Sequence, residues 1–339
     1  MNYFYILAIP LIIYFVNTFI KYKKLLPSLS GEKHQLFVGQ NNVPLSGGII
    51  IVITFLFMEK FNVNLFFISI FLIGFFSDLK IIKSPRIRFF LQVLFILLFV
   101  IFYDFQISNI RIFILDFLLR YKFFSYFFVI FCLLIIINGT NFIDGLNGLV
   151  LGYFILLLII IYNLRLYENL NITQFEILYF TLLLFFLLLF NFFNKLYIGD
   201  SGSYLLGFSF GILLIAIYES NLTISPFFIV LLLWYPCFEN LFSIIRKYRF
   251  NKSPLKSDNK HFHQLLFYFI KKKFKLNSLT SNNLCSILIN IFNISTISIG
   301  TINIFNTQFQ ILIIFFNIII YITIYLQLFD FRFKKITQS

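Results

Sequence analysis

The chain has 339 residues, of which 60% are hydrophobic and only 12% are charged, and its mean hydropathy is +0.93. This composition excludes an ordinary soluble domain and predicts an all-α, polytopic transmembrane helical bundle. The net charge of +14 does not indicate a nucleic-acid-binding protein, because the basic residues are dispersed among loops and form no interleaved binding patch.

Apolar windows, most of them close to the roughly 20 residues that cross a bilayer, predict about 10–11 transmembrane helices in one integral membrane domain over residues 1–339. The windows at about 46–58 and 64–76 are short, so a re-entrant pair is the alternative there. No basic residue precedes the first window, which favours a transmembrane helix over a cleaved signal peptide.

Lysine and arginine predict the orientation in the membrane. If the N-terminus lies outside, the inner loops hold all of the 27 basic residues except Lys60, Arg111, Arg120, Lys122 and Arg165. We therefore expect the C-terminus to lie in the cytoplasm. The same rule places the polar loops there, at about 21–47, 77–88, 138–147, 191–203 and 247–281.

The first inner loop ends in Pro44, Gly47 and Gly48 at a helix entrance. Free backbone N–H groups at such an entrance can bind an anion, although a turn with a Gly-Gly cap explains this loop better when it is taken alone. In the next inner loop, Asp78 ends an apolar window and several cations follow it, among them Arg88. Anchoring at the membrane surface explains the cations but not the carboxylate, so Asp78 indicates a functional site.

The outer loop 104–122 is expected to be a connector or an interfacial helix. The segment NGTNFIDGLNG then brings together Asn138, Asn141, Asp144 and Asn147 between two apolar windows. A capped break between helices needs one or two polar residues, and uncompensated polar groups at membrane depth are costly. The polar density of this segment therefore favours a binding site.

The loop that contains Lys195 and Asp200 carries the letters GDSGS, as do trypsin-like proteases, but the helical pattern excludes their β-barrel fold. A P-loop sequence is absent. Glu239, in a later apolar window, suits an intrahelical network and a functional role equally well.

His261 and His263 stand two residues apart in the longest inner loop, beside Lys256 and Lys260. A helical zinc site needs histidines four residues apart, so hydrogen bonding to a phosphate is favoured over zinc. The isolated cysteines Cys132, Cys237 and Cys285 indicate neither a disulfide framework nor a thiolate metal site.

The predicted topology places Asp78, Asp144 and Asp200 on one face of the membrane. Three carboxylates with amide carbonyls and histidines nearby suit Mg²⁺, which prefers oxygen ligands and keeps substrate phosphates in its shell. We therefore expect a site for Mg²⁺ and a diphosphate.

These motifs, in this order, resemble those of the polyprenyl-phosphate N-acetylhexosamine-1-phosphate transferases of glycosyltransferase family 4. This superfamily includes undecaprenyl-phosphate GlcNAc-1-phosphate transferases and phospho-MurNAc-pentapeptide translocases. The resemblance covers residues from about 31 to 265 and rests on NNVPLSGG, GFFSDLKIIKSPRIRFFLQ, NGTNFIDGLNG, KLYIGDSGSYLLG and HFHQ.

The resemblance implies transfer of an N-acetylhexosamine 1-phosphate from a UDP-sugar to undecaprenyl phosphate, with release of UMP. The short histidine motif HFHQ favours the GlcNAc-type branch of the family. It implies Mg²⁺ as the cofactor, for which Mn²⁺ substitutes. It also implies that the protein lies in the bacterial inner membrane and starts a lipid-linked cell-surface glycan, such as O-antigen or a cell-wall polymer. A homodimer is left open.

Carried over residue by residue, the resemblance implies catalytic roles for Asp78, Asp144, Asp200, His261 and His263, with Asp200 and Asp78 as metal ligands. It implies that substrate is bound by Pro44, Gly47, Gly48, Arg88, Asn138, Asn141, Asn147 and Lys195.

Ser77 and Asn147 stand where the family usually has aspartates. If catalysis required the family's aspartate at position 77 as a general base, this chain would be inactive, because it has Ser77 there. A polyprenyl phosphate, however, has a second pKa of about 6 and is largely dianionic at pH 7, so it attacks without giving up a proton. Catalysis by positioning and charge neutralisation then survives Ser77.

Two alternatives stay open. A transporter also builds sites from broken helices, but it should place its acidic residues near the bilayer midplane and show repeated halves. The second alternative is a member of the family whose activity is lowered by Ser77 and Asn147.

Overall fold

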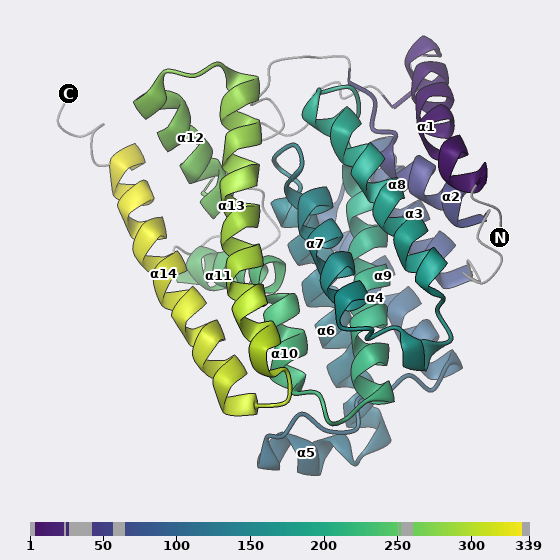
Figure 1. The fold of residues 1–339 in the computed structure, drawn as a ribbon, viewed down its shortest axis with the longest axis vertical. Coiled ribbons are helices and arrows are strands. Elements are labelled where there is room, and N and C mark those ends of the chain that lie inside the picture. Colours follow the sequence, from purple (N-terminus) through teal and green to yellow (C-terminus); the bar gives the residue numbers. More distant parts are fainter. Residues whose placement is uncertain are drawn as a thin grey trace.

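The computed structural model describes residues 4–23, 25–26, 43–56, 65–249, 251 and 260–333, and these form a helical bundle (Figure 1). Its helices, in chain order, are α1 (Phe4–Tyr22), α2 (Gly47–Leu56), α3 (Leu65–Asp78), α4 (Pro85–Phe102), α5 (Phe113–Leu119), α6 (Lys122–Ile143), α7 (Leu149–Asn163), α8 (Gln174–Phe192), α9 (Gly199–Ser220), α10 (Pro226–Leu232), α11 (Trp234–Arg249), α12 (Phe262–Phe274), α13 (Ser278–Gly300) and α14 (Thr307–Phe333). The predicted all-α class is confirmed.

Six of the described helices, α4, α6, α8, α9, α13 and α14, are long and apolar enough to cross a bilayer. The bent pair α10 and α11 is together long and apolar enough for a broken span or a re-entrant loop, and three shorter apolar helices lie at Ala8–Tyr22, Leu65–Asp78 and Leu149–Asn163. The protein is therefore a multi-pass membrane protein, as predicted. Helices α2 and α3 have 10 and 14 residues, in line with the two short apolar windows, and the re-entrant arrangement stays a prediction.

Helix α9 is the central helix of the bundle. In α9, 83% of the most apolar window is buried, against 22–44% in the other candidate spans. Glycines let its neighbours come close: a methyl group at Gly74 of α3 would lie 2.4 Å from the Cα of Ser201, and one at Gly207 would lie 2.8 Å from the Cα of Ile137 on α6. The small residues thus hold α3 and α6 against α9, whose first residues belong to the candidate site.

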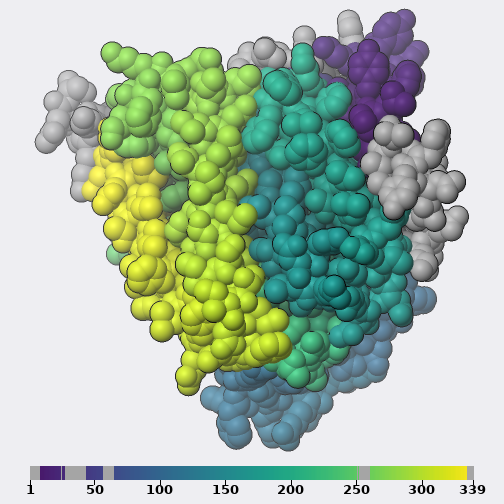
Figure 2. Space-filling model, viewed as in Figure 1, coloured from purple at the N-terminus to yellow at the C-terminus, as the bar shows by residue number. Residues whose placement is uncertain are grey.

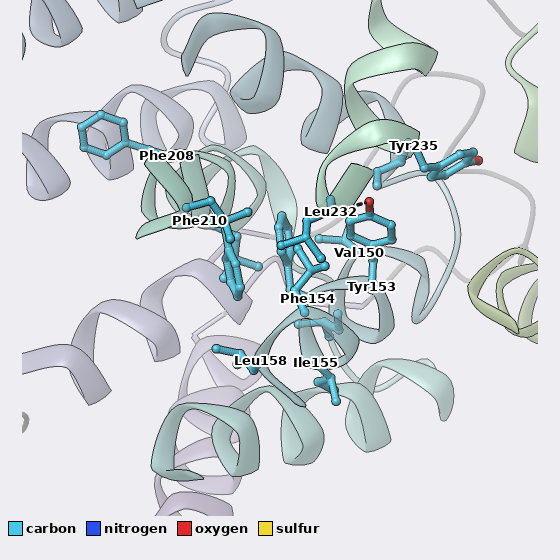
Figure 3. Packing of buried hydrophobic residues seen from close by; sticks show 14 of the residues in the cluster. Val150, Tyr153, Phe154, Ile155, Leu158, Phe208, Phe210, Leu232 and Tyr235 are labelled. Carbon is cyan, nitrogen blue, oxygen red and sulfur yellow. Dashed lines mark hydrogen bonds between the residues drawn. The ribbon is translucent and has the colours of Figure 1, made fainter. Parts of the chain in front are cut away.

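The interior next to α9 is filled by aromatic and aliphatic side chains from α7, α9 and α10 (Figure 3). Phe154 stacks on Phe210 with ring centroids 4.1 Å apart. Large apolar side chains also stay exposed on the outer surface, among them Leu312, Phe315 and Phe316 of α14. Helices α13 and α14 form the left part of the face seen in Figure 2. A surface of this kind suits contact with lipid.

The apolar window at 226–244, which we expected to form one span, is broken in the structure: α10 and α11 meet at an angle of 78°. Pro236 explains the break, because proline has no N–H to donate to the carbonyl of Leu232 and its ring crowds that group. The buried Tyr153 hydroxyl donates to the Leu232 carbonyl instead, at 2.7 Å (Figure 3). The break therefore keeps its backbone satisfied, and it sets the direction of α11.

At the opposite end of α9 from Asp200, Arg111 joins three connecting segments. Its guanidinium donates to the carbonyls of Leu222, Thr223, Ile224 and Phe305 at 2.8–3.0 Å. The 104–122 loop, predicted as a connector, contains the short helix α5 and closes this end of the bundle.

Candidate active site

Asp200, in the first turn of α9, lies at the centre of a polar cluster. Its Oδ2 accepts hydrogen bonds from the Ser77 hydroxyl of α3 and from Nη1 of Arg88 on α4, both at 2.6 Å. Its Oδ1 accepts from the Asn141 side-chain amide of α6 at 2.7 Å. Arg88 also donates to the Ser77 hydroxyl at 2.6 Å. Four helices, α3, α4, α6 and α9, therefore meet at one carboxylate.

Asp78 binds the start of α9 through its side chain. Its two carboxylate oxygens accept the backbone N–H groups of Asp200 and Ser201 at 2.8 and 3.0 Å. These N–H groups have no partner within their own helix, so the carboxylate satisfies them and meets the positive end of the helix dipole. Gly199 has a φ of 75°, and a methyl group there would lie 2.7 Å from Asp78 Oδ2. Asp78 thus positions the aspartate loop, and its role as a metal ligand stays a prediction.

Asn138 lies one helical turn before Asn141 and makes a different contact. Its side-chain amide donates to Oε1 of the buried Gln92 at 3.0 Å and to the Leu134 carbonyl. Gln92 itself lies one turn after Arg88 on α4. Asn138 therefore joins α6 to α4 beside the cluster, and its contact with substrate stays a prediction.

Asp144 ends α6 and remains partly exposed. None of the described residues donates a hydrogen bond to its carboxylate. Burial, together with the charges of Asp200 and Asp78, raises the pKa of Asp144 well above its usual range. A carboxylate held among like charges and without a donor is one that a bound cation would stabilise.

A small pocket adjoins Asp144, with a volume of about 30 Å³, room for a water-sized group. Asn147 lines this pocket together with Asn191, Tyr197, Gly199 and Asn282. The Asn147 N–H donates to the Asn282 side-chain oxygen at 2.7 Å, and the Asn147 side-chain amide lies 3.4 Å from that of Asn194. Asn147 therefore belongs to the wall of the pocket.

The histidine loop packs on the Asp144 loop. The ring of His261 lies 5.3 Å from that of Phe142 and 5.7 Å from that of His263, measured between centroids. A methyl group at Gly145 would lie 2.5 Å from Nε2 of His263, so only glycine fits there. The predicted convergence of the three aspartate loops and the histidine loop is confirmed.

The glycine loop does not offer the free N–H groups that we expected for an anion. Gly47 and Gly48 donate to the carbonyls of Tyr197 and Ile198 at 3.0 and 3.2 Å, and the Pro44 carbonyl accepts the N–H of Tyr197. Close packing of α2 on the start of α9 explains these residues, and a substrate contact through them stays a prediction. Lys195, which lies two residues before Tyr197, is exposed. Residues 27–42 and 252–259 of the predicted site loops, Lys256 included, lie outside the described residues.

Sequence reasoning missed or left open several members of this region. Ser77 was treated only as a departure from a pattern, yet it bridges Arg88 and Asp200. Lys247 was counted only for topology, but it is buried with its ammonium group 5.4 Å from the ring of Phe142. Glu239 was left undecided and is fully buried beside the histidine loop. For Glu239 the available signal was a charged residue within an apolar window.

The oxygen donors of the cluster fit Mg²⁺. Asp200, Asp144 and the side-chain carbonyl of Asn141 are hard ligands from two neighbouring elements. Among the described residues, no three acidic, histidine or cysteine side chains form a ready-made metal site. Mg²⁺ commonly takes one or two carboxylates and completes its shell with water and substrate phosphates, so these residues suffice for it.

Comparison with known proteins agrees with this geometry. Residues 60–218 match the model of glycosyl transferase family 4. A Bacillus subtilis protein named probable undecaprenyl-phosphate N-acetylglucosaminyl 1-phosphate transferase is 31% identical over 214 residues, covering 60% of this chain and 56% of its own length. A Thermotoga maritima undecaprenyl-phosphate alpha-N-acetylglucosaminyl 1-phosphate transferase is 29% identical over 224 residues, covering 66% and 67%.

The chain thus spans little more than half the length of the Bacillus relative. The matched region contains Asp78, Asp144 and Asp200, whereas the histidine loop follows it. The region from residue 60 to residue 218 is thus similar to glycosyl transferase family 4, the family that the motifs resemble.

Proposed function

We propose that this protein is an enzyme that transfers N-acetylglucosamine 1-phosphate from UDP-N-acetylglucosamine to undecaprenyl phosphate, with Mg²⁺ as cofactor and UMP as product. The observation that carries the proposal is the meeting of Asp200 with Arg88, Asn141 and Asp78 inside the family region. The names of the two relatives support the sugar and the lipid acceptor.

In this reaction a phosphate oxygen of undecaprenyl phosphate attacks the phosphorus that carries the sugar. A new diphosphate bond forms to the lipid, the bond to the bridging oxygen breaks, and UMP leaves with that oxygen. The attacking phosphate has a second pKa of about 6, so at pH 7 it is largely dianionic and needs no base to remove a proton. The Ser77 hydroxyl at the position of a family aspartate is compatible with this chemistry.

The residues of the cluster then act by positioning and by balancing charge. Asp200, with Asp144 as the second carboxylate, would hold the cation, because Asp144 accepts no hydrogen bond from a described residue and shares the negative charge of Asp200. When bound, Mg²⁺ neutralises the diphosphate as a Lewis acid. Arg88, which neutralises Asp200 in this structure, supplies a cation for a substrate phosphate, and the histidine loop closes the other side.

We also propose that the active site faces the cytoplasm of a bacterium, with the N-terminus outside and the C-terminus inside. The surplus of lysine and arginine in the loops of the site end supports this orientation. Labelling of a Lys195→Cys variant in intact cells by a membrane-impermeant thiol reagent would contradict it, because this exposed position lies at the site end.

The test is an assay of the purified protein with undecaprenyl phosphate, Mg²⁺ and a panel of UDP-sugars, following UMP release. We expect release with UDP-N-acetylglucosamine that EDTA stops and that Asp200→Asn lowers by at least about 100-fold, the scale of losing a key electrostatic group. Asp104→Asn is the matched control. Asp104 follows the far end of α4, about 24 Å along the helix from Arg88, so this variant should keep wild-type activity.

Absence of UMP release with every UDP-N-acetylhexosamine would refute the transferase. Reduced but Mg²⁺-dependent release that rises when Ser77 is replaced by aspartate would instead identify a family member weakened at this position. A transporter would move labelled nucleotide sugar across proteoliposomes without forming UMP.

A further inference from the structure

We propose that Glu239 is a positioning residue, which acts through His261 to hold the histidine loop over the nucleotide-sugar site. The inference rests on the proposed function. The observation behind it is a fully buried carboxylate on α11 whose donors come from the histidine loop and from α14, while the three site aspartates lie on other elements.

The first step of the argument is the hydrogen bonding of Glu239. Its Oε1 lies 2.8 Å from Nδ1 of His261 and 3.4 Å from the Phe262 N–H. Its Oε2 accepts the Tyr321 hydroxyl at 2.6 Å. An ionised carboxylate can only accept hydrogen bonds, so Nδ1 of His261 must carry the proton. The imidazole is thereby held in one orientation and one tautomer.

This orientation leaves Nε2 on the side of the ring away from Glu239. The His261 ring packs on Phe142, whose neighbour Asn141 donates to Asp200. Fixing the His261 ring against Phe142 therefore places the imidazole beside the Asp200 cluster.

A second anchor on α11 fixes the same loop. Arg246, two helical turns after Glu239, donates to the Lys260 carbonyl and to the Tyr325 hydroxyl, the latter at 2.8 Å. Tyr325 donates to the same Lys260 carbonyl at 3.1 Å. The loop is held on both sides of His261, and the break between α10 and α11 sets where these anchors point.

The experiment is a double-mutant cycle on the Kd for UDP-N-acetylglucosamine, measured by calorimetry on the full chain in detergent with Mg²⁺ and without the lipid acceptor. We expect Glu239→Gln to weaken binding about tenfold, the scale of removing the carboxylate partner of a functional histidine. In a His261→Ala background the same change should weaken binding less than about twofold, because coupled residues are not additive.

Glu176→Gln is the matched control, because Glu176 is also a buried glutamate but caps the start of α8, and its Kd should equal the wild-type value. Tyr321→Phe, which removes the other contact of Glu239, should change Kd less than Glu239→Gln does. A wild-type Kd in Glu239→Gln would overturn the inference, and so would losses that add in the double variant. If the wild type binds the nucleotide sugar but never releases UMP, the proposed function is wrong. The double-mutant cycle on Kd still measures the role of Glu239 in that case.

Discussion

Ser77 offers the most informative substitution, because its hydroxyl joins the two charged groups of the cluster. It donates to Asp200 and accepts from Arg88, each at 2.6 Å. The direct Arg88–Asp200 pair, also at 2.6 Å, survives its removal. A hydrogen bond to a charged group contributes about 1.5–3 kcal/mol, and Ser77 is only half-buried, so the lower end applies.

We therefore expect Ser77→Ala to lower kcat/KM for UMP release by roughly tenfold, the equivalent of about 1.4 kcal/mol. The Asp104→Asn variant serves as control in the same assay. Ser77→Ala with wild-type kcat/KM would show that the hydroxyl does not help to place Asp200 in the transition state.

Ser77→Asp probes the same contact by adding a negative charge beside Asp200. Two unit charges about 4 Å apart repel by about 4 kcal/mol at an effective dielectric constant of 20, and Arg88 offsets part of this. The variant should unfold at a lower temperature than wild type in EDTA, and Mg²⁺ should raise its Tm by more than it raises that of wild type. An equal Mg²⁺ shift in both proteins would refute the placement of the cation beside Asp200.

Two further substitutions test other parts of the structure. Gly145→Ala places a methyl group 2.5 Å from Nε2 of His263, so it should displace the histidine loop. We expect calorimetry to show weaker binding of UDP-N-acetylglucosamine. An unchanged Kd would contradict the packing of this loop on the Asp144 loop. Tyr153→Phe leaves the Leu232 carbonyl at the break without its donor, at a cost of about 1–3 kcal/mol. The variant should therefore have a lower Tm than wild type in detergent. A wild-type Tm would show that another donor or a water molecule replaces the hydroxyl.

The loops that meet at the site could be predicted from sequence because membrane topology leaves few options. Polar residues at the ends of apolar windows, sorted by the lysines and arginines around them, indicated that Asp78, Asp144 and Asp200 share one end of the bundle. Asp200 donates its N–H to Asp78 and accepts a hydrogen bond from Asn141, which confirms that both residues lie beside it.

The partners within that cluster could not be predicted, because they depend on the rotation and depth of each helix. The roles of Asp78 and Arg88 toward ligands stay predictions, but their partners within the protein, the start of α9 and Asp200, were not predicted. The Gly47 and Gly48 N–H groups bind carbonyls of a segment about 150 residues away, which no local pattern reveals. The break at Pro236 carried a sequence signal, the proline itself, that the length of the window obscured.

The central claim is that the chain transfers a sugar 1-phosphate and not a sugar. The most direct measurement is the identity of both products when purified protein is incubated with UDP-N-acetylglucosamine, undecaprenyl phosphate and Mg²⁺. We expect UMP and a diphosphate-linked lipid sugar in equal amounts, both abolished by EDTA and both strongly reduced in Asp200→Asn. UDP together with a monophosphate-linked lipid sugar, or neither product, would contradict the account.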